Sequence, residues 1–228
     1  MRTDLVLVLA LALAGAVTAC TTSAAPSHAD GAVDVTVSCQ GLDGAIPGTP
    51  VATFDQDVEG FVLDQAAGST IQNLGEPDAG ATPPPSLSWD GTDGSPTPGS
   101  LQFVVPFSGA NQYLGAYHFF GCSAPQNWND KTQRARIKIT GGDFAPVALV
   151  YVATSATCTT YDFAYGAFAR LNRASCWQEL TLDLVSPASR TGGFDPTSVV
   201  EFGVQLYSGT GSVDAGTATL VVDSFSIE

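Results

Sequence analysis

The stretch VVEFGVQLY, residues 199–207, alternates between apolar side chains and small or polar ones. A period of two predicts a β-strand with one face in a hydrophobic core and the other face outside it. The core side would carry Phe202, Val204 and Leu206. The other side would carry Gly203, Gln205 and Tyr207, so an amide and a phenol share one sheet face.

Six further stretches of β-branched and aromatic residues are separated by clusters of Gly, Pro, Asp and Ser. They are residues 35–39, 101–105, 135–139, 148–153, 179–184 and 217–227. Almost no apolar pattern has helical spacing, so we expect an all-β fold of two packed sheets. Residues 82–85 and 89–99 are predicted loops, because Pro cannot donate to a central ladder and Gly suits turns.

Residues 1–19 have the pattern of an export signal, an apolar run that ends in small residues and is too short to span a bilayer. The ending VTAC, residues 17–20, is similar to a bacterial lipobox, and this resemblance implies that Cys20 is lipidated. Plain secretion with Cys20 as an ordinary thiol is the alternative. Thr21 favours the outer membrane by analogy with Gram-negative sorting, so we expect an exported protein with a lipid anchor in the bacterial cell envelope.

Residues 20–34 are rich in Ser, Ala, Thr and Pro without an apolar period, which predicts a flexible tether. Residues 35–228 have a length that one β-sandwich domain commonly reaches, and we expect a monomer. The chain carries 8 basic and 22 acidic residues, a net charge of −14, which argues against nucleic acid as a partner. The few basic residues cluster as Lys131, Arg134, Arg136 and Lys138 on one predicted strand face, either solvated or in contact with an anionic glycan.

Four cysteines remain if Cys20 carries lipid, an even number that predicts two disulfides in an exported chain. Three connectivities are possible. We favour Cys158 with Cys176, because they flank one local segment, and Cys39 with Cys122, which would tie the lead-in to the body. Zinc is disfavoured, because the chain has no C-x-x-C and only two histidines.

Six motifs occur in an order that resembles the galactose-binding-like jelly-roll carbohydrate-binding modules appended to bacterial β-mannanases and related polysaccharide hydrolases. The resemblance covers about residues 51–228 and implies a jelly-roll β-sandwich of two antiparallel sheets. The motifs are ATFDQDVEGF (52–61), SWDGTDGSPTPGSLQFVVPF (88–107), NWNDKTQRARIKI (127–139), WQELTLDL (177–184), DPTSVVEFGVQL (195–206) and TLVVDSFSIE (219–228).

The resemblance also implies a structural Ca²⁺ near the first and last strands, with ligands from Asp55, the loop that contains Asp93, and Asp223. Acidic Gly-rich loops can supply the hard oxygen ligands that Ca²⁺ takes. The alternative is that these carboxylates cap turns or are solvated. Asp223 favours calcium, because a carboxylate inside an apolar run is costly unless it is exposed, paired or ligated.

Sugar binding requires flat aromatic faces for the pyranose ring and polar groups for its hydroxyls. We predict a ligand platform on a concave sheet face, made of Gln205, Tyr207, Tyr151, Tyr161 and Tyr165, with Tyr113 and Tyr117 next. The alternative for each tyrosine is packing in the core or at an edge. Residues 158–176 form a longer and more aromatic segment than we expect there, with a small helix around residues 167–172, and would wall or cover a groove.

Catalysis is disfavoured. A glycosidase needs two carboxylates about 5 to 10 Å apart, one with a raised pKa. The available carboxylates are Asp162, Glu179, Asp183 and Glu201, of which Glu179 and Asp183 share a predicted strand face only by parity. His118 is the only histidine beyond the tether, and no G-x-S-x-G elbow is present. The sequence therefore favours a non-catalytic surface lipoprotein that binds carbohydrate. A structural or adhesive envelope lipoprotein that binds a protein is the first alternative, and a glycan-active enzyme is the second.

Overall fold

The structure, a computed structural model, describes residues 35–36, 42, 44–64, 84–107, 109–110, 112–142, 146–171, 176–208 and 216–228. Residues 1–34, with the predicted signal, Cys20 and tether, lie outside the described residues, as does Cys39. The described chain consists of β-strands and one short 3-10 turn, η1 (Pro196–Ser198). No helix in this part of the chain is long and apolar enough to cross a membrane.

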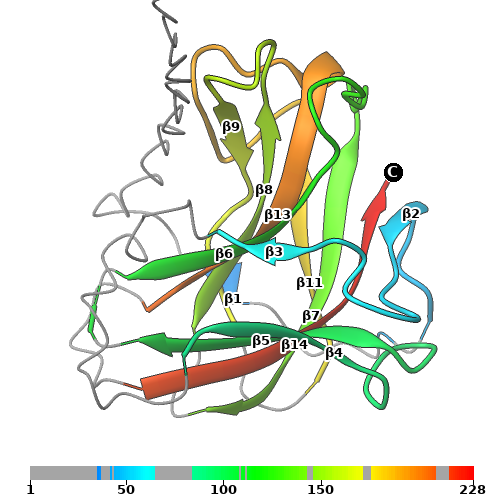
Figure 1. Ribbon diagram of the computed structural model, residues 1–228, viewed down its shortest axis with the longest axis vertical. Helices are drawn as coiled ribbons and strands as arrows, with labels where there is room; N and C mark the ends of the chain where they lie inside the picture. The colour runs from blue at the N-terminus through cyan, green and yellow to red at the C-terminus, as the bar shows by residue number, and fades with distance from the viewer. Residues whose placement is uncertain are drawn as a thin grey trace, which may run out of the picture.

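The strands form two sheets (Figure 1). The larger sheet has eight strands, in the order β1 (Val35–Thr36), β10 (Ala169–Arg170), β8 (Val147–Thr154), β13 (Val199–Tyr207), β6 (Tyr113–Phe119) and β3 (Val62–Leu63), with β9 (Asp162–Tyr165) beside β8 and β12 (Ser189–Arg190) beside β9. The six-stranded sheet runs β11 (Gln178–Asp183), β7 (Thr132–Gly142), β14 (Gly216–Ile227), β5 (Ser100–Phe107) and β4 (Ser86–Asp90), with β2 (Thr49–Ala52) beside the end of β14. Pairing is antiparallel except between β1 and β10.

The core lies between the sheets and contains apolar side chains from both. Phe202 of β13 faces inward together with Val204 and Leu206, as the alternation in residues 199–207 predicts. Phe61 is at the centre, with its ring centroid 5.4 Å from that of Phe202 and 5.3 Å from that of Phe225 on the opposite sheet. This arrangement is the jelly-roll β-sandwich that we expected.

The six strands predicted after residue 39 are all present, and of residues 35–39 the structure describes β1 alone. The predicted loop 89–99 is wrong at its start, because Trp89 and Asp90 belong to β4 and pair with β5. The expected helix around residues 167–172 is also wrong, since residues 169–170 are β10 and pair with β8. At these positions pairing with a neighbouring strand overrides local sequence preference.

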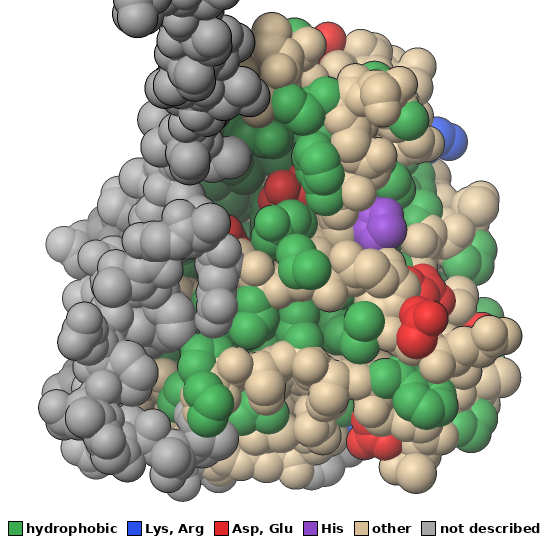
Figure 2. Space-filling view, viewed as in Figure 1, with side chains coloured by type: hydrophobic (Ala, Val, Ile, Leu, Met, Phe, Trp, Pro, Cys, Tyr) green, Lys and Arg blue, Asp and Glu red, His purple; other side chains and the backbone are tan. Residues whose placement is uncertain are grey.

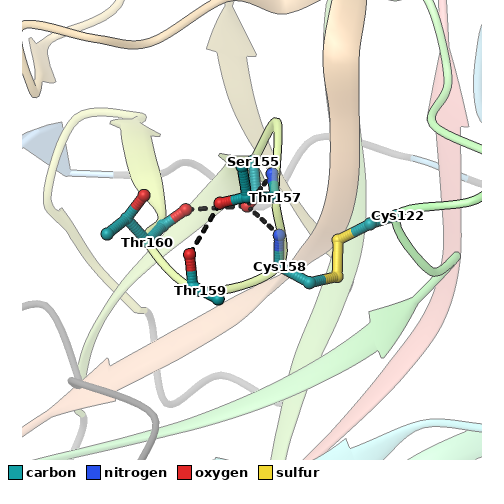
Figure 3. The surroundings of a disulfide bond; sticks show 6 residues. All are labelled: Cys122, Ser155, Thr157, Cys158, Thr159 and Thr160. Carbon is teal, nitrogen blue, oxygen red and sulfur yellow. Dashed lines mark hydrogen bonds between the residues drawn. A yellow bond between two sulfur atoms is a disulfide. The ribbon is translucent and has the colours of Figure 1, made fainter.

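The described disulfide joins Cys122 and Cys158, whose Cα atoms lie 5.8 Å apart (Figure 3). This pairing overturns both favoured bridges, Cys158 with Cys176 and Cys39 with Cys122. Strands β6 and β8 flank β13, and both run antiparallel to it, so they end at the same edge of the sheet. Cys122 follows β6 and Cys158 follows β8, which brings them together although 36 positions separate them. Cys176 is also disulfide-bonded.

Candidate functional site

The outer face of the eight-stranded sheet, opposite the core, carries a second hydrophobic cluster. The strand registers place its side chains in rows across β9, β8, β13 and β6. One row consists of Tyr165, Tyr151, Gly203 and Tyr117. The next two rows consist of Leu149, Gln205 and Gly115, and of Val147, Tyr207 and Tyr113. We call this surface the aromatic face; its aromatic members are Tyr113, Tyr117, Tyr151, Phe163, Tyr165, Phe168 and Tyr207.

Two glycines leave room on the aromatic face. A Cβ atom on Gly203 would lie 2.9 Å from Cε1 of Tyr151, so glycine lets the tyrosine ring cross β13. A Cβ atom on Gly115 would lie 3.3 Å from both the Cγ of Gln205 and the Cβ of Asp64. Figure 2 shows a hollow over β8 and β13 in which hydrophobic and acidic side chains meet.

Hydrogen bonds fix the polar groups of this face. The Tyr151 hydroxyl donates to Oε1 of Glu201 over 2.8 Å, and the Tyr207 hydroxyl donates to Oε1 of Gln205 over 2.8 Å. The backbone N–H of Asp64, directly after β3, donates to the carbonyl of Gly115 over 2.8 Å and brings the Asp64 side chain to the same face. Two carboxyl groups and one amide therefore lie among the aromatic rings.

Both carboxyl groups have raised pKa values. The pKa of Glu201 is raised to about 7, chiefly by burial; the Tyr151 hydrogen bond acts to lower it, and the negative charge of Asp64 acts to raise it. Burial also raises the pKa of Asp64. Burial disfavours the charged form of an acid. Near neutral pH, Glu201 is therefore a mixture of the carboxylate and the protonated carboxylic acid.

The structure brings four of the five predicted platform residues together but buries them. Gln205, Tyr207, Tyr151 and Tyr165 are at most 5% exposed, and the hydroxyls of Tyr151 and Tyr207 bond to neighbouring side chains. Tyr161 is half-buried before β9 and lies outside the cluster. The half-buried rings of the face are Tyr113, Tyr117, Phe163 and Phe168.

Sequence reasoning missed three members of this face and the role of a fourth. Asp64, Phe163 and Phe168 were not singled out, and Glu201 was considered only as a catalytic carboxylate. The alternation along the strand could have identified Asp64. Phe61 is buried in the core and Val62 is exposed, so Asp64, two positions after Val62, lies on the outer face. Phe163 and Tyr165 share the outer face of β9 by the same alternation.

The structure brings two of the three expected calcium ligands, Asp55 and Asp223, to one pocket and pairs the third, Asp93, with a lysine. In the part of the chain that the structure describes, no three His, Cys, Asp or Glu side chains form a group that could hold a metal ion. Asp55 and Asp223 line one pocket, but Asp93 pairs with Lys138, whose Nζ lies 2.5 Å from Oδ1. Both oxygens of Asp223 already accept hydrogen bonds, from the N–H of Ser95 and the hydroxyl of Ser224.

The basic cluster lies on the outer face of the other sheet and is largely paired. Arg134 of β7 forms ion pairs with Glu179 and Glu228, and Lys138 lies over the Trp177 ring, 4.4 Å from its centroid. Neighbouring acids thus engage Arg134 and Lys138, and Arg136 is buried, whereas Lys131 is exposed before β7.

The residues that we considered for catalysis are placed as follows. Glu179 is held by Arg134, and Asp183 caps the following turn by accepting the N–H of Val185 over 2.9 Å. His118 lies beside the rings of Phe61 and Phe202, and its Nδ1 is 2.8 Å from the carbonyl oxygen of Glu59.

No protein-family model matches the chain, and none of the curated proteins matches its sequence. Among solved structures, the chain is similar to a carbohydrate-binding module of the β-sandwich superfamily, with a TM-score of 0.52 and 17% identity over 79% of this chain and 62% of that one. It is also similar to part of an exo-β-agarase, with a TM-score of 0.50 and 10% identity over 79% of this chain and 25% of the agarase. A further match is the family 11 carbohydrate-binding module of a cellulosomal cellulase of Clostridium thermocellum, with a TM-score of 0.48 and 12% identity over 80% of this chain and 94% of that one.

The chain thus spans less than two thirds of the first of these structures and a quarter of the agarase. At these identities the likeness concerns the fold, a β-sandwich that carbohydrate-binding modules also have.

Proposed function

We propose that this protein binds polysaccharide non-catalytically on the aromatic face. The observation that carries the proposal is the gathering of aromatic rings, two carboxyl groups and one amide over a hollow on a single sheet face. Binding sites for small polar ligands combine apolar walls with a few placed polar groups, and a pyranose ring needs both. The similarity to carbohydrate-binding modules supports the proposal as an analogy of fold.

The half-buried rings and the buried ones have different roles. Tyr113, Tyr117 and Phe163 keep part of their surface accessible and would stack on the apolar faces of sugar rings. Tyr151 and Tyr207 are positioning residues, because their hydroxyls hold Glu201 and Gln205 at fixed points where hydroxyls of the glycan can bond.

The charge of the site favours a neutral polysaccharide. Among the residues that the structure describes, the two charged groups between the rings, Asp64 and Glu201, are acidic, and Arg170 lies at the edge of the face, in register with Val147. The whole chain carries a net charge of −14. A polyanionic glycan would be repelled, whereas neutral hydroxyls can donate to both carboxylates.

Affinity gel electrophoresis with neutral polysaccharides such as mannan, xylan and β-glucan tests the proposal. We expect retardation of the wild-type protein, weaker retardation of Tyr117→Ala and Glu201→Gln, and no change for Val185→Ala, an exposed apolar control after β11. If no glycan retards the wild-type protein and a protein partner co-purifies with it, the adhesive alternative replaces this proposal.

We also propose that the protein acts at the cell envelope, as a lipoprotein of the outer membrane anchored through Cys20. The support is the apolar signal pattern and the VTAC ending, residues 17–20. The mass of the N-terminal peptide from membrane fractions tests this, and Cys20→Ala should release the protein from the detergent phase. An unmodified Cys20 in the mature protein would leave plain secretion.

A further inference from the structure

Arg136 is a buried cation on the outer face of the six-stranded sheet. Its neighbours in β7, Ala135 and Ile137, point into the core, so the Arg136 side chain points to the opposite side. It is 1% exposed and is the largest of the fully buried side chains that the structure describes. A buried charge costs several kcal/mol unless other groups compensate it, so the groups around this guanidinium indicate its role.

Arg136 forms hydrogen bonds with backbone oxygens from two segments that are distant in the sequence. Its Nη1 donates to the carbonyl of Gly44 and, over 3.2 Å, to the carbonyl of Ser95. Ser95 is held on two further sides, because its N–H donates to Oδ1 of Asp223 over 2.5 Å and its hydroxyl donates to the carbonyl of Leu42 over 3.1 Å. The guanidinium therefore ties Gly44 and the loop at Ser95 to β7, and Ser95 in turn holds Leu42.

A β-bulge supplies the opposite charge. In the pairing of β14 with β7, Val222 lies opposite Ile137 and Ser224 lies opposite Arg136, so Asp223 is the extra residue. The bulge keeps Val222 and Phe225 in the core while Asp223 takes the outer side, 5% exposed. The charge of Arg136 acts against the burial that raises the pKa of Asp223.

We infer that Arg136 is a built-in structural cation, which does in this protein what a bound metal ion would do at the same place. Carbonyl oxygens from two segments and a carboxylate from the last strand are the ligands that Ca²⁺ takes. Here a covalently attached guanidinium engages the two carbonyls and lies close enough to influence the carboxylate. The guanidinium repels a divalent cation by its charge and occupies the carbonyl oxygens with its N–H groups. The wild-type fold therefore does not depend on calcium. This disagrees with the calcium that the family resemblance implies.

Thermal unfolding of the full chain, in excess calcium and in excess chelator, tests the inference. We expect the wild-type protein to melt at the same temperature in both, and isothermal titration with calcium to give no binding heat. Arg136→Met keeps the apolar stem but removes the charge, and should melt roughly 10 °C lower in chelator. A lower wild-type melting temperature in chelator, or an Arg136→Met protein as stable as wild type in chelator, overturns the inference.

Two further variants make the test specific. In Arg136→Met the oxygens of Gly44, Ser95 and Asp223 lose their cation, so calcium should raise its melting temperature, and adding Asp223→Asn should abolish that rise. If Arg136→Met does not fold, Arg136→Lys retains the charge with fewer donors and should melt at an intermediate temperature, still unchanged by chelator. An Arg136→Lys protein that melts lower in chelator than in calcium would contradict the inference.

Discussion

The Tyr151 hydroxyl donates a hydrogen bond to Oε1 of Glu201 over 2.8 Å, and the tyrosine ring reaches it by crossing Gly203 of β13. A fully buried phenol is thereby coupled to a carboxyl group whose pKa lies at about 7. Glu201 is itself half-buried, so its protonation state can respond to the solvent and to a ligand on the aromatic face.

Glu201 should make the protein less stable as the pH rises through neutrality. Its pKa is raised in the fold, from 4.5 to about 7, so its stabilising contribution is complete below about pH 4.5 and is lost as the pH passes about 7. Urea unfolding between these limits should show a fall of about 2 to 3 kcal/mol in the free energy of unfolding. Glu201→Gln should flatten the profile, and an equally steep profile in that variant would assign the fall to other groups.

Tyr151→Phe separates the hydrogen bond from the packing of the ring. The variant should lose about 1 kcal/mol of stability. It should also raise the pKa of Glu201, because the hydroxyl bond lowers that value in the wild-type protein. The pKa can be followed by NMR of the Glu201 carboxyl carbon, with Tyr161→Phe as a control outside the cluster. An unchanged or lower Glu201 pKa in Tyr151→Phe would contradict the coupling.

Gly203→Ala should displace the Tyr151 ring and disrupt the packing of the aromatic face. The new Cβ atom would clash with the backbone oxygen of Ala116 and lie 2.9 Å from Cε1 of Tyr151, closer than packed atoms allow. We expect a loss of about 2 kcal/mol in unfolding free energy and weaker retardation by neutral polysaccharide. Gly192→Ala is the matched control, because no atom lies within 4 Å of its added Cβ. Equal effects of the two substitutions would contradict close packing at Gly203.

The sequence predicted the strands with a strong period of two, but not the shorter strands around the site. Residues 199–207 follow the alternation, so both the core side and the outer side of β13 were predictable. Strand β6 was missed because Gly115 and His118 interrupt its apolar pattern. The burial of Tyr151 and Tyr207 depends on neighbours from other strands, which the period of a single strand does not describe.

The disulfide and the burial of Arg136 also depend on contacts between distant segments, which local sequence patterns do not describe. Local spacing favoured Cys158 with Cys176, whereas strand order brings Cys122 to Cys158 from the two flanks of β13. The alternation of basic residues placed Arg136 on an outer face, and only the tertiary structure shows that Gly44 and the loop at Ser95 contact its guanidinium. Long-range pairing determines both features.

Removal of the Cys122–Cys158 bridge should destabilise the fold without abolishing it. The bridge closes a loop of 36 residues, so the double variant Cys122→Ser/Cys158→Ser should lose about 2 to 4 kcal/mol, chiefly because its unfolded chain is less constrained. Urea unfolding measures this loss. Peptide mapping without reduction should recover a peptide that contains both Cys122 and Cys158; recovery of a Cys158–Cys176 peptide instead would contradict the structure.

The acidic side chains should determine which polysaccharides the aromatic face accepts. At neutral pH and low salt, we expect neutral polysaccharide to retard the wild-type protein and polygalacturonate to leave it unretarded, because Asp64 and the ionised fraction of Glu201 repel uronates. The double variant Asp64→Asn/Glu201→Gln removes that repulsion and should begin to bind polygalacturonate, while its affinity for the neutral polysaccharide falls with the loss of two acceptors. Val185→Ala should behave as the wild-type protein with both polymers. Wild-type binding to polygalacturonate would contradict the charge selectivity and leave carbohydrate binding intact, because stacking on the half-buried rings does not depend on the charge of the polymer.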